Sequence, residues 1–374
     1  MNSMALARFA EYCKEQKLSS ALLSNPATIA WLTGYAPPIQ TGPNPFEGGP
    51  ALGWWREGEL TLVVSDAEVG AARAQGIDAR DYLAYTIEGP AAGFQNQGAI
   101  LKEVLGTSSR LSAPVGIEPD LLPASLLDML KDAFPLASWM RLDSGLDLLR
   151  AVKSPDEIER IRAALALCDL AQAETRRLIR PGISEIEVWG QVKARLEVAT
   201  ACRLPVLADF LAGVRTAEIG GLPGGYVLSA ADALIADIVP RLNGYWGDNA
   251  GTHFAGEPLP ELSKAYRTVL DALREAIGAI RPGVRACELD MRLRQAIQRA
   301  GYPSYPHHSG HGLGVTYHEE PRIVPYNKLA LQPGMVIAME PGIYLPNIGG
   351  VRLEDVVLVT QDGCEVLTQH LGNS

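Results

Sequence analysis

The first part of the chain alternates short apolar runs with amphipathic stretches. Apolar runs bounded by turn-forming residues predict strands at 21–23, 51–55, 60–64 and 114–117. Apolar positions that recur at helical spacing predict helices at 4–16, 97–105 and 121–133. Strands that alternate with helices in this way are typical of α/β domains. We therefore expect an α/β domain over residues 1–145.

A strong helix start marks the beginning of a second domain. Ser154 is suited to the N-cap, Pro155 to the first helical position, and Glu157 stands three residues after the cap. A long amphipathic helix should follow, to about Leu178. Because 374 residues exceed the usual size of one hydrophobic core, we expect a second domain over residues 146–374.

The second domain contains a hint of an internal repeat. The tripeptide Arg-Pro-Gly occurs at 180–182 and again at 281–283. Each copy follows one helical stretch and precedes another, at about 184–198 and 286–300, and strand-like segments come next. Repetition at this spacing predicts a domain built of two similar halves.

The N-terminal domain has one conspicuous loop, at residues 36–50, which is rich in proline and glycine and precedes Trp54 and Trp55. Such a loop either covers an active site or simply connects two strands at the surface. The first 145 residues contain no histidine, and their acids are scattered. The chemistry is therefore expected in the second domain.

Composition describes an ordinary globular protein, with 47% hydrophobic and 20% charged residues. A net charge of −10 without a basic run argues against nucleic acid as a partner. The N-terminus carries charges where a signal peptide needs an apolar region, and no later segment is apolar for long enough to cross a bilayer. We expect a cytoplasmic protein without a membrane partner. The cysteines are odd in number and never spaced as CxxC, so they resemble buried apolar residues rather than disulfides or zinc ligands (Cys13, Cys168, Cys202, Cys287 and Cys364).

Histidine is concentrated in one segment, YPHHSGHGLGVTYHEEPRI. Four of the six histidines, His307, His308, His311 and His318, lie between residues 305 and 323. Imidazole is the commonest metal ligand and titrates near neutral pH, so this crowding favours a metal site or proton transfer. The alternative is a glycine-rich surface loop with solvated histidines.

Two aspartates are predicted to share one face of a hairpin. Asp237 interrupts the apolar strand 234–239, and Asp248 lies in its predicted partner strand, 244–254. Asn243-Gly244 is a strong signal for a two-residue turn. That turn places Asp248 opposite Val239, one diagonal step from Asp237, so the two carboxylates can converge on a common ion.

A second acidic pair follows near the C-terminus. Glu340 ends one apolar strand, and Glu354 interrupts another with Asp355 beside it. The connection between them is too long for the turn to fix which way each side chain points. If all four acids met at about 5 Å, each pair would repel by roughly 3 kcal/mol at an effective dielectric constant near 20. Two divalent cations would balance the four charges.

These residues resemble the pita-bread metallopeptidases, which include aminopeptidase P, Xaa-Pro dipeptidase (prolidase) and methionine aminopeptidase. Asp237, Asp248, His311 in GHGLG, Glu340 in MEPGIY and Glu354 in GVRLED occur in the family's order. The segment NPATIAWLTGY at 25–35 is similar to the aminopeptidase P and prolidase branch. The resemblance implies that these five residues hold two divalent ions, typically Mn²⁺, with Co²⁺ or Zn²⁺ as alternatives, and that a metal-bridging hydroxide attacks the substrate.

The same resemblance implies roles for further residues. Glu340 matches the carboxylate that shuttles the proton, and His318 matches the histidine that stabilises the tetrahedral intermediate. His307, four residues before His311, matches a substrate-binding position, with His308 as its rival. Arg352 is expected to steady a ligand carboxylate. Tyr344 is either a supporting hydrogen bonder or a packed strand residue.

The spacing of two histidines requires an irregular backbone. His311 and His318 are seven residues apart, and a regular strand would point them to opposite faces. We therefore expect a bulge or turn at Gly312 or Gly314.

Two departures from the family pattern concern the substrate. The region before Asp237 lacks the histidine that usually lines the pocket, and the family's Asp-x-Thr-Arg-Thr is replaced by Asp-Asn-Ala-Gly-Thr at 248–252. Hydrolysis of small peptides next to proline is the leading prediction, by a homodimer as the family implies. The alternatives are a pita-bread enzyme acting on a small non-peptide molecule and a binding protein that has lost catalysis. Loss of catalysis usually removes ligands, and all five are present here.

Overall fold

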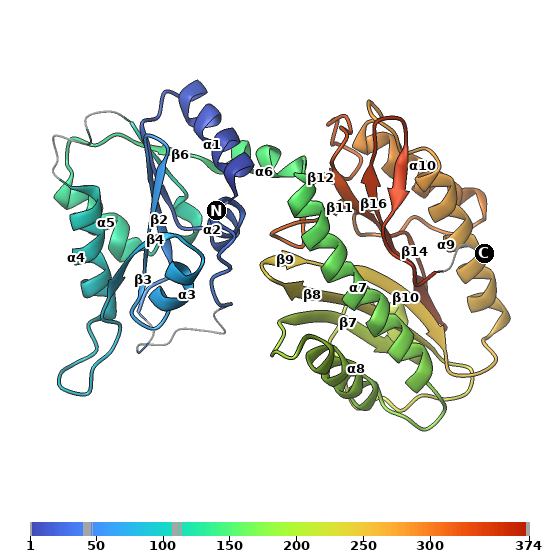
Figure 1. Cartoon of the computed structure of the whole chain (residues 1–374). Coiled ribbons are helices and arrows are strands. Elements are labelled where there is room, and N and C mark those ends of the chain that lie inside the picture. The colour runs from blue at the N-terminus through green and yellow to red at the C-terminus, as the bar shows by residue number, and fades with distance from the viewer. Residues whose placement is uncertain (1, 40–45, 47, 107–110, 112–113, 372–374) are drawn as a thin grey trace. The chain divides into compact units, whose positions relative to one another are not determined.

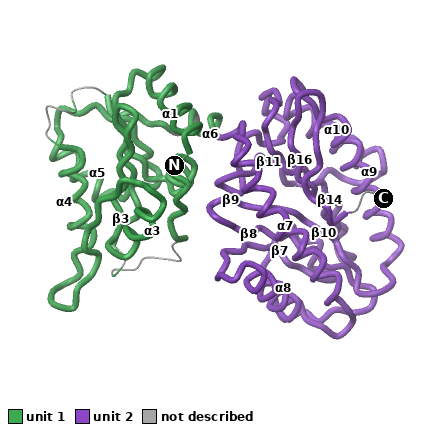
Figure 2. The backbone as a smooth tube through the Cα atoms, viewed as in Figure 1, with its two compact units in different colours: residues 1–149 green, residues 150–374 purple. Residues whose placement is uncertain are grey.

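The computed structural model describes residues 2–39, 46, 48–106, 111 and 114–371. The chain forms two compact units, residues 1–149 and 150–374 (Figure 2). The predicted domain boundary, at residue 145, falls inside helix α6 (Asp143–Ala151). In the structure the first unit ends at residue 149, near the end of that helix. Each unit contains its own sheets and its own apolar core.

The first unit is built on a six-stranded mixed sheet with the order β4-β3-β2-β1-β5-β6 (Figure 1). The four predicted strands are confirmed as β1 (Ser20–Leu23), β2 (Leu52–Arg56), β3 (Glu59–Ser65) and β5 (Val115–Ile117). Two strands were not predicted, β4 (Asp78–Tyr82) and β6 (Trp139–Arg141). Both are edge strands that carry polar or half-exposed residues, so they lack the apolar run that reveals a central strand.

The helices of the first unit lie on this sheet. Three predicted helices are confirmed, with small shifts of their ends, as α1 (Ser3–Glu15), α4 (Gly93–Leu105) and α5 (Ala124–Ala133, after the 3₁₀ turn Pro119–Leu121). Three helices were not predicted, α2 (Pro26–Thr33), α3 (Val69–Ala74) and α6 at the end of the unit. In α2 every residue from 27 to 33 is buried, so the helix has no polar face to reveal its period. Much of the predicted loop at 36–50, namely residues 40–45 and 47, lies outside the described residues.

Four long helices frame the second unit: α7 (Pro155–Leu178), α8 (Glu185–Thr200), α9 (Pro260–Ile277) and α10 (Ala286–Arg299). The predicted start of α7 is confirmed. The Ser154 side chain accepts from the backbone N–H of Glu157, and the Glu157 carboxylate accepts from the backbone N–H of Ser154. Such reciprocal capping satisfies two of the donors that every helix start leaves open.

The strands of the second unit form two main sheets. The first has the order β10-β8-β7 and contains β7 (Val206–Ala212), β8 (Ala233–Leu242) and β10 (Asn249–Phe254), with β9 (Tyr245–Trp246) paired to β8. The second has the order β12-β11-β13-β16-β17 and contains β11 (Gly310–Gly312), β12 (Glu319–Ile323), β13 (Val336–Met339), β16 (Asp355–Val359) and β17 (Cys364–Val366). A short hairpin of β14 (Gly342–Leu345) and β15 (Gly349–Arg352) completes the unit. The 3₁₀ helix Gly213–Ala217 follows β7 and packs on β15.

The two Arg-Pro-Gly segments have matching hydrogen bonds. Gly182 and Gly283 have φ angles of 85° and 86°, the left-handed region that glycine enters without strain. The N–H of Gly182 donates to Leu228, and that of Gly283 donates to Leu331. One apolar core cluster consists mainly of residues from α7, α8, β7 and β8. Another consists mainly of residues from α9, α10 and the strands after them. The second unit is therefore built of two similar halves, as the repeat predicts.

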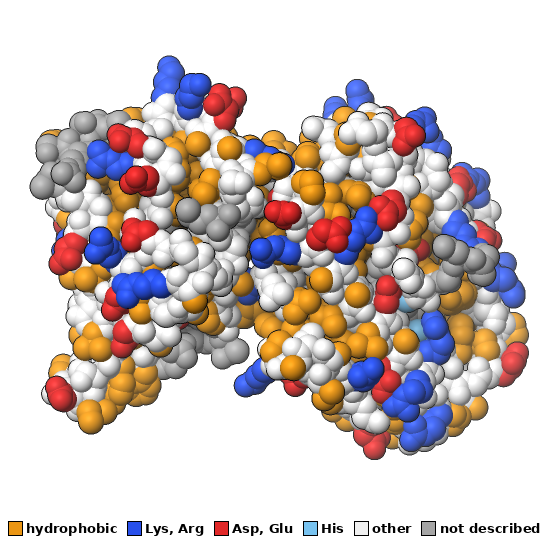
Figure 3. Space-filling model, viewed as in Figure 1, with side chains coloured by type: hydrophobic (Ala, Val, Ile, Leu, Met, Phe, Trp, Pro, Cys, Tyr) orange, Lys and Arg blue, Asp and Glu red, His pale blue; other side chains and the backbone are white. Residues whose placement is uncertain are grey.

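The surface agrees with the balance of charges in the sequence. On the face seen in Figure 3, basic and acidic side chains are interspersed rather than gathered in one basic stripe. No described helix is both long enough and apolar enough to cross a bilayer. All five cysteines are free thiols.

Candidate metal centre

The predicted hairpin of the two aspartates is confirmed. Asn243 and Gly244 have φ angles of 48° and 88°, as a tight two-residue turn of this kind requires. Leu242 pairs with Tyr245, and Ile238 pairs with Asn249. The same register puts Asp248, in the break between β9 and β10, opposite Val239. Asp237, Asp248 and Glu354 each offer an oxygen, and the three oxygens lie within 4.8 Å of one another.

The structure also answers what the sequence left open about Glu340 and Glu354. Met339 pairs with Asp355 at the end of β13, and Gly342 pairs with Arg352 at the start of β14. Both pairs belong to one continuous register, which sets Glu340 opposite Glu354. The two glutamates occupy the point where the hairpin passes from the five-stranded sheet into β14 and β15. The two side chains therefore enter the same site.

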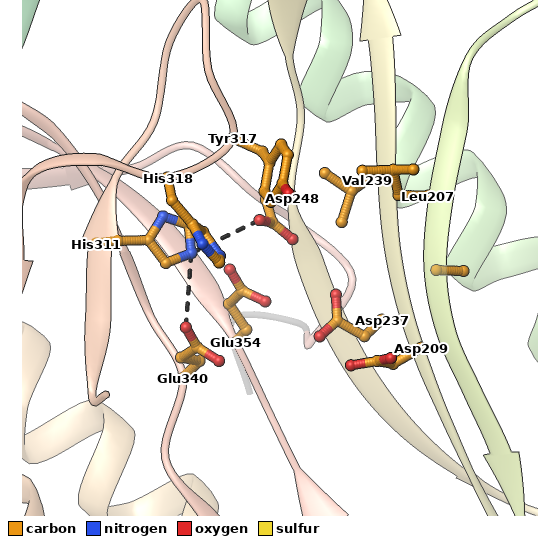
Figure 4. A pocket seen from close by; sticks show the side chains of 11 residues that line it. Leu207, Asp209, Asp237, Val239, Asp248, His311, Tyr317, His318, Glu340 and Glu354 are labelled. Carbon is orange, nitrogen blue, oxygen red and sulfur yellow. Dashed lines mark ion pairs between the residues drawn. The ribbon is translucent and has the colours of Figure 1, made fainter. Parts of the chain in front are cut away.

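His311 connects the two acidic pairs. It pairs with Ala338 in β13, so Glu340, two residues further on, lies on the same face. His311 Nε2 is 3.6 Å from Asp248 Oδ2 and 3.5 Å from Glu340 Oε1 (Figure 4). His311 Nδ1 lies 3.0 Å from the Gly312 carbonyl, to which it can only donate. The Nε2 lone pair therefore faces the acids and is available to a metal ion.

The irregular backbone predicted near the histidines is confirmed. The pairing of β11 with β12 shifts register between Gly310 and Gly312. The chain then turns through residues 313–318, with the Gly314 N–H donating to the Thr316 carbonyl. The rings of His311 and His318 come within 4.2 Å of each other, centroid to centroid. A regular strand could not produce this contact.

A buried ion pair supports the loop that carries His318. The Lys153 ammonium lies 2.9 Å from Glu319 Oε2, and the two side chains are 1% and 2% exposed. Glu319 Oε1 accepts from the backbone N–H of Thr316. A Cβ atom at Gly314 would lie 2.6 Å from the Glu319 carboxylate, so glycine there lets the loop close around this acid without displacing it.

His307 and His308 have different surroundings. Both ring nitrogens of His307 are engaged, Nε2 with the Tyr344 hydroxyl at 2.9 Å and Nδ1 with the His308 carbonyl at 2.7 Å. His308 Nδ1 is 3.3 Å from Glu340 Oε1, whereas His307 Nδ1 is 4.0 Å from Glu340 Oε2. The His308 ring also lies 5.1 Å from that of His318. Geometry thus brings His308, the rival of the residue favoured by spacing, nearer to the acids.

Arg352 is bound to two carboxylates beside the cluster. Its Nη2 lies 2.9 Å from Asp237 Oδ2 and 3.2 Å from Asp209 Oδ2. Its Nη1 donates to the Tyr344 hydroxyl at 3.3 Å and to the Ile219 carbonyl. Tyr344 therefore links Arg352 to His307. Tyr344 also lies in β14 and packs against the apolar core, so it combines hydrogen bonding with strand packing.

Asp209 is a cavity residue that the sequence reading missed. It lies in β7 directly opposite Asp237. The signal was present, because Asp209 is a lone acid in the apolar run VLADFLA, just as Asp237 is in ALIADIV. A cavity of about 210 Å³ contains the proposed ligands and Asp209; it is lined by Leu207, Ala208, Asp209, Asp237, Val239, Asp248, His311, Tyr317, His318, Glu340 and Glu354.

The electrostatics of the cluster favour a bound cation. Burial, with repulsion from neighbouring acids, raises the pKa of Asp248 and Glu354 well above the usual range. Burial raises the pKa of Glu340 to about 8, although Arg352 opposes the shift. Burial lowers the pKa of His311 well below its usual value and that of His318 to about 4, so both rings are neutral at pH 7. A neutral imidazole has a lone pair that can bind a metal ion, and a bound cation would offset the repulsion between the carboxylates.

One buried oxygen shows that the cluster fits a metal. Glu354 Oε1 is buried and has no hydrogen-bond partner among the described residues. An unpaired buried carboxylate oxygen costs several kcal/mol, and a cation would remove that cost. Four carboxylates with one imidazole, and no thiolate, form a donor set suited to hard divalent ions.

Comparison with known proteins assigns the family. Residues 159–361 match Metallopeptidase family M24, and residues 6–152 match the Creatinase/Prolidase N-terminal domain. The chain belongs to metallopeptidase family M24. The predicted two-domain fold, with a pita-bread catalytic domain after a creatinase/prolidase-like domain, is thereby confirmed. M24 membership also implies that the protein binds divalent metal, and the acidic cluster is a candidate site for it.

Relatives of this M24 protein cover nearly its whole length. The Bacillus subtilis (strain 168) protein YkvY is 32% identical over 366 residues, or 98% of this chain and 97% of the relative. The Xaa-Pro dipeptidase of Pyrococcus furiosus is 29% identical over 365 residues and 97% of both chains. The crystal structure of the prolidase from Pyrococcus horikoshii OT3 matches with a TM-score of 0.85 at 26% identity, covering 99% of each chain. The M24 protein is thus a metallopeptidase of the Xaa-Pro dipeptidase-like kind.

Proposed function

We propose that this metallopeptidase hydrolyses Xaa-Pro bonds at the amino terminus of small peptides, as a dipeptidase or as an aminopeptidase P. The observation that carries the proposal is the convergence of Asp237, Asp248, His311, Glu340 and Glu354 on one cavity, together with His318 at its edge. Relatives named as Xaa-Pro dipeptidase and prolidase support the substrate class.

The five converging residues would hold two divalent cations, with Mn²⁺ the best match to an oxygen-rich donor set. When bound, such ions supply Lewis acidity and lower the pKa of water in the site. The proposal includes a homodimer, as the family resemblance implies, and a cytoplasmic location, as the charged N-terminal segment favours.

Glu340 is placed to move a proton. Its carboxylate lies within 3.5 Å of both His308 and His311 and lines the cavity that the substrate would enter. A carboxylate in this position can accept a proton from water and return it to the leaving proline nitrogen. The position of Glu340 thus suits it to general acid/base catalysis.

His318 and His308 contribute imidazole groups to the site, with His318 beside Asp248 and His311. His318 is neutral at pH 7 and exposed, so its ring N–H can donate to the oxygen on which negative charge develops. His308 lies between Glu340 and His318 and is available to the substrate. His307, held by Tyr344, positions this wall of the site. Arg352 fixes the orientation of Asp237.

The proposal is tested with Mn²⁺-loaded protein and a panel of Xaa-Pro dipeptides, longer Xaa-Pro peptides and matched Xaa-Ala peptides. Release of the first residue only when proline follows it is the expected result. Comparing dipeptides with longer peptides distinguishes dipeptidase from aminopeptidase activity. Absence of release from every peptide would defeat the peptidase assignment.

A second candidate is hydrolysis of a small non-peptide substrate by the same centre. The observation that favours it is the loop after β7, residues 218–225, which contains no histidine. This loop is pinned by the Gly221 N–H to Asp209 and by the Ile219 carbonyl to Arg352. The loop therefore borders Asp209 and Arg352 without the histidine that the family pattern places before the first ligand aspartate. Turnover of amide and ester substrates that lack proline, with no Xaa-Pro hydrolysis, would favour this candidate.

A further inference from the structure

Asp209 extends the acidic face of the β10-β8-β7 sheet by one strand beyond the proposed ligands. Asp209 pairs with Asp237, and Leu207 pairs with Val239. Partners directly opposite, and residues two apart on one strand, share a face of the sheet. Asp209 and Leu207 therefore face the cavity that contains the proposed metal ligands, as Figure 4 shows.

The proposed metal ions would not neutralise the negative charge of Asp209, unlike the charges of the other acids in the cavity. Two cations would neutralise the four ligand carboxylates, but Asp209 is not among them. Like charges directly opposite each other destabilise a sheet, and Arg352 offsets this repulsion by lying between Asp209 and Asp237. Among the residues that line the cavity, Asp209 is thus the one acid outside the ligand set.

The Asp209 carboxylate can also accept further hydrogen bonds. Its Oδ1 accepts from the Gly221 N–H at 2.9 Å, and its Oδ2 accepts from Arg352. An ionised carboxylate offers about four acceptor positions, so these two bonds leave capacity unused. The side chain is 39% exposed, compared with 14% for Asp237. The unused capacity is therefore accessible from the cavity.

Substrate chemistry supplies a matching donor. In an unblocked peptide cleaved after its first residue, the ammonium group is attached to the carbon next to the scissile carbonyl. An ammonium has three donors and no acceptor, so a site that binds this carbonyl must offer an acceptor nearby. Leu207 and Val239 lie next to Asp209 and Asp237 on the same face and present apolar surface for the first side chain.

We infer that Asp209 determines specificity by receiving the free amino group of the substrate's first residue, with the side chain of that residue against Leu207 and Val239. The inference rests on the proposed exopeptidase function and narrows it to peptides with an unblocked amino terminus. Asp209 is expected to act on binding rather than on the bond-breaking step.

Binding of paired hydroxamates tests the inference without turnover. Leucine hydroxamate and its des-amino counterpart, 4-methylpentanohydroxamate, differ only in the amino group. Calorimetry with Mn²⁺-loaded protein at pH 6.5 keeps that group protonated. The wild type should bind leucine hydroxamate roughly tenfold to a hundredfold more tightly, as a charge-assisted hydrogen bond provides. Asp209→Asn should reduce this ratio to about threefold or less.

Two controls separate recognition from structural damage. The affinity of Asp209→Asn for the des-amino hydroxamate and its metal content should match the wild type, because the amide still fills the same space. Asp271→Asn, an acid-to-amide change on the exposed side of α9, should keep the wild-type ratio.

The outcomes are distinct. An unchanged ratio in Asp209→Asn, or equal loss of both hydroxamates, would show that Asp209 only steadies Arg352, and would overturn the inference. A wild type without preference for the amine, or without affinity for either hydroxamate, would overturn it as well. Loss of the ratio in Asp209→Asn, in a protein that hydrolyses no Xaa-Pro peptide, would uphold Asp209 and defeat the proposed function.

Discussion

The two faces of β10 contrast sharply in how their polar groups are satisfied. On the front face, beside Asp248, carboxylates crowd together, and Glu354 Oε1 has no partner among the described residues. On the back face, Asn249 and His253 lie against α7 and form hydrogen bonds with its Gln172. Gln172 donates to Asn249 Oδ1 at 2.9 Å and accepts from His253 at 2.7 Å.

The network on the back face continues into the C-terminal segment. His370 Nδ1 lies 3.2 Å from the Asn249 amide, and its Nε2 lies 3.2 Å from the Ala250 carbonyl. That carbonyl also accepts from the backbone N–H of Glu354. The back face therefore fixes the backbone that presents the front-face acids.

This contrast indicates that the two faces have different roles. Buried polar groups that the protein satisfies by itself specify one structure. Buried acids that it leaves crowded and partly unpaired are balanced by something from outside the chain. The same contrast explains the altered segment after Asp248. A Cβ atom at Gly251 would lie 2.6 Å from the Gln172 side chain, so Gly251 permits the close packing of β10 on α7.

The most severe change to the front face is Asp248→Asn. Loss of this charge from the proposed ligand set should reduce kcat/KM by at least about a thousandfold, because the proposed reaction needs bound metal. In metal-free protein the same change should raise the free energy of unfolding by about 1 kcal/mol, since it removes repulsion among buried acids. Peptide hydrolysis, elemental analysis and urea unfolding in excess chelator measure these effects. A less stable metal-free variant would contradict the proposed contrast between the faces.

His318→Ala tests the front face without touching a proposed ligand. Removing a donor to the developing negative charge should lower kcat by roughly a hundredfold to a thousandfold. Metal content should stay at the wild-type level. A variant that loses metal together with activity would instead make His318 a ligand, as its proximity to Asp248 and His311 allows.

Gln172→Leu tests the back face. Asn249 and His253 would each lose a buried partner, which should cost about 2 kcal/mol in the free energy of unfolding, with or without metal. Metal affinity should also fall, because Asn249 adjoins Asp248. Gln191→Leu on the exposed surface of α8 is the matched control and should change stability by less than about 0.5 kcal/mol. Equal effects of the two changes in urea unfolding would refute the back-face network.

The smallest expected effect is the pH dependence of the free energy of unfolding of the metal-free protein. The pKa of Glu340 is raised to about 8 in the folded chain, whereas an unfolded glutamate titrates near 4.3. The folded state therefore binds the Glu340 proton more tightly than the unfolded state does. The stability that this proton provides is lost as the pH rises towards 8. Between pH 7 and 8, where histidines of the unfolded chain are mostly neutral, each such carboxyl should cost at most about 1.4 kcal/mol of unfolding free energy per pH unit. Saturating Mn²⁺ should remove this dependence, and a flat metal-free profile would contradict it.

The sequence by itself determined the elements whose causes are local. The Ser154 capping box began α7 where predicted, and Asn243-Gly244 fixed a register that brought Asp237 and Asp248 to one face. The order of ligand motifs was enough to predict the family. In each case the deciding chemistry lies within a few residues, so no distant contact is needed to interpret it.

Tertiary structure decided the rest. Glu340 and Glu354 face each other because β13–β16 and β14–β15 keep one register across a long connection, which no single turn specifies. The bulge at β11 brings His311 to His318, and packing against Tyr344 turns His307 away from the position that His308 takes. Asp209 reaches the cavity only through the pairing of β7 with β8. These arrangements depend on contacts between segments far apart in sequence, where local preference carries no information about which side chains meet.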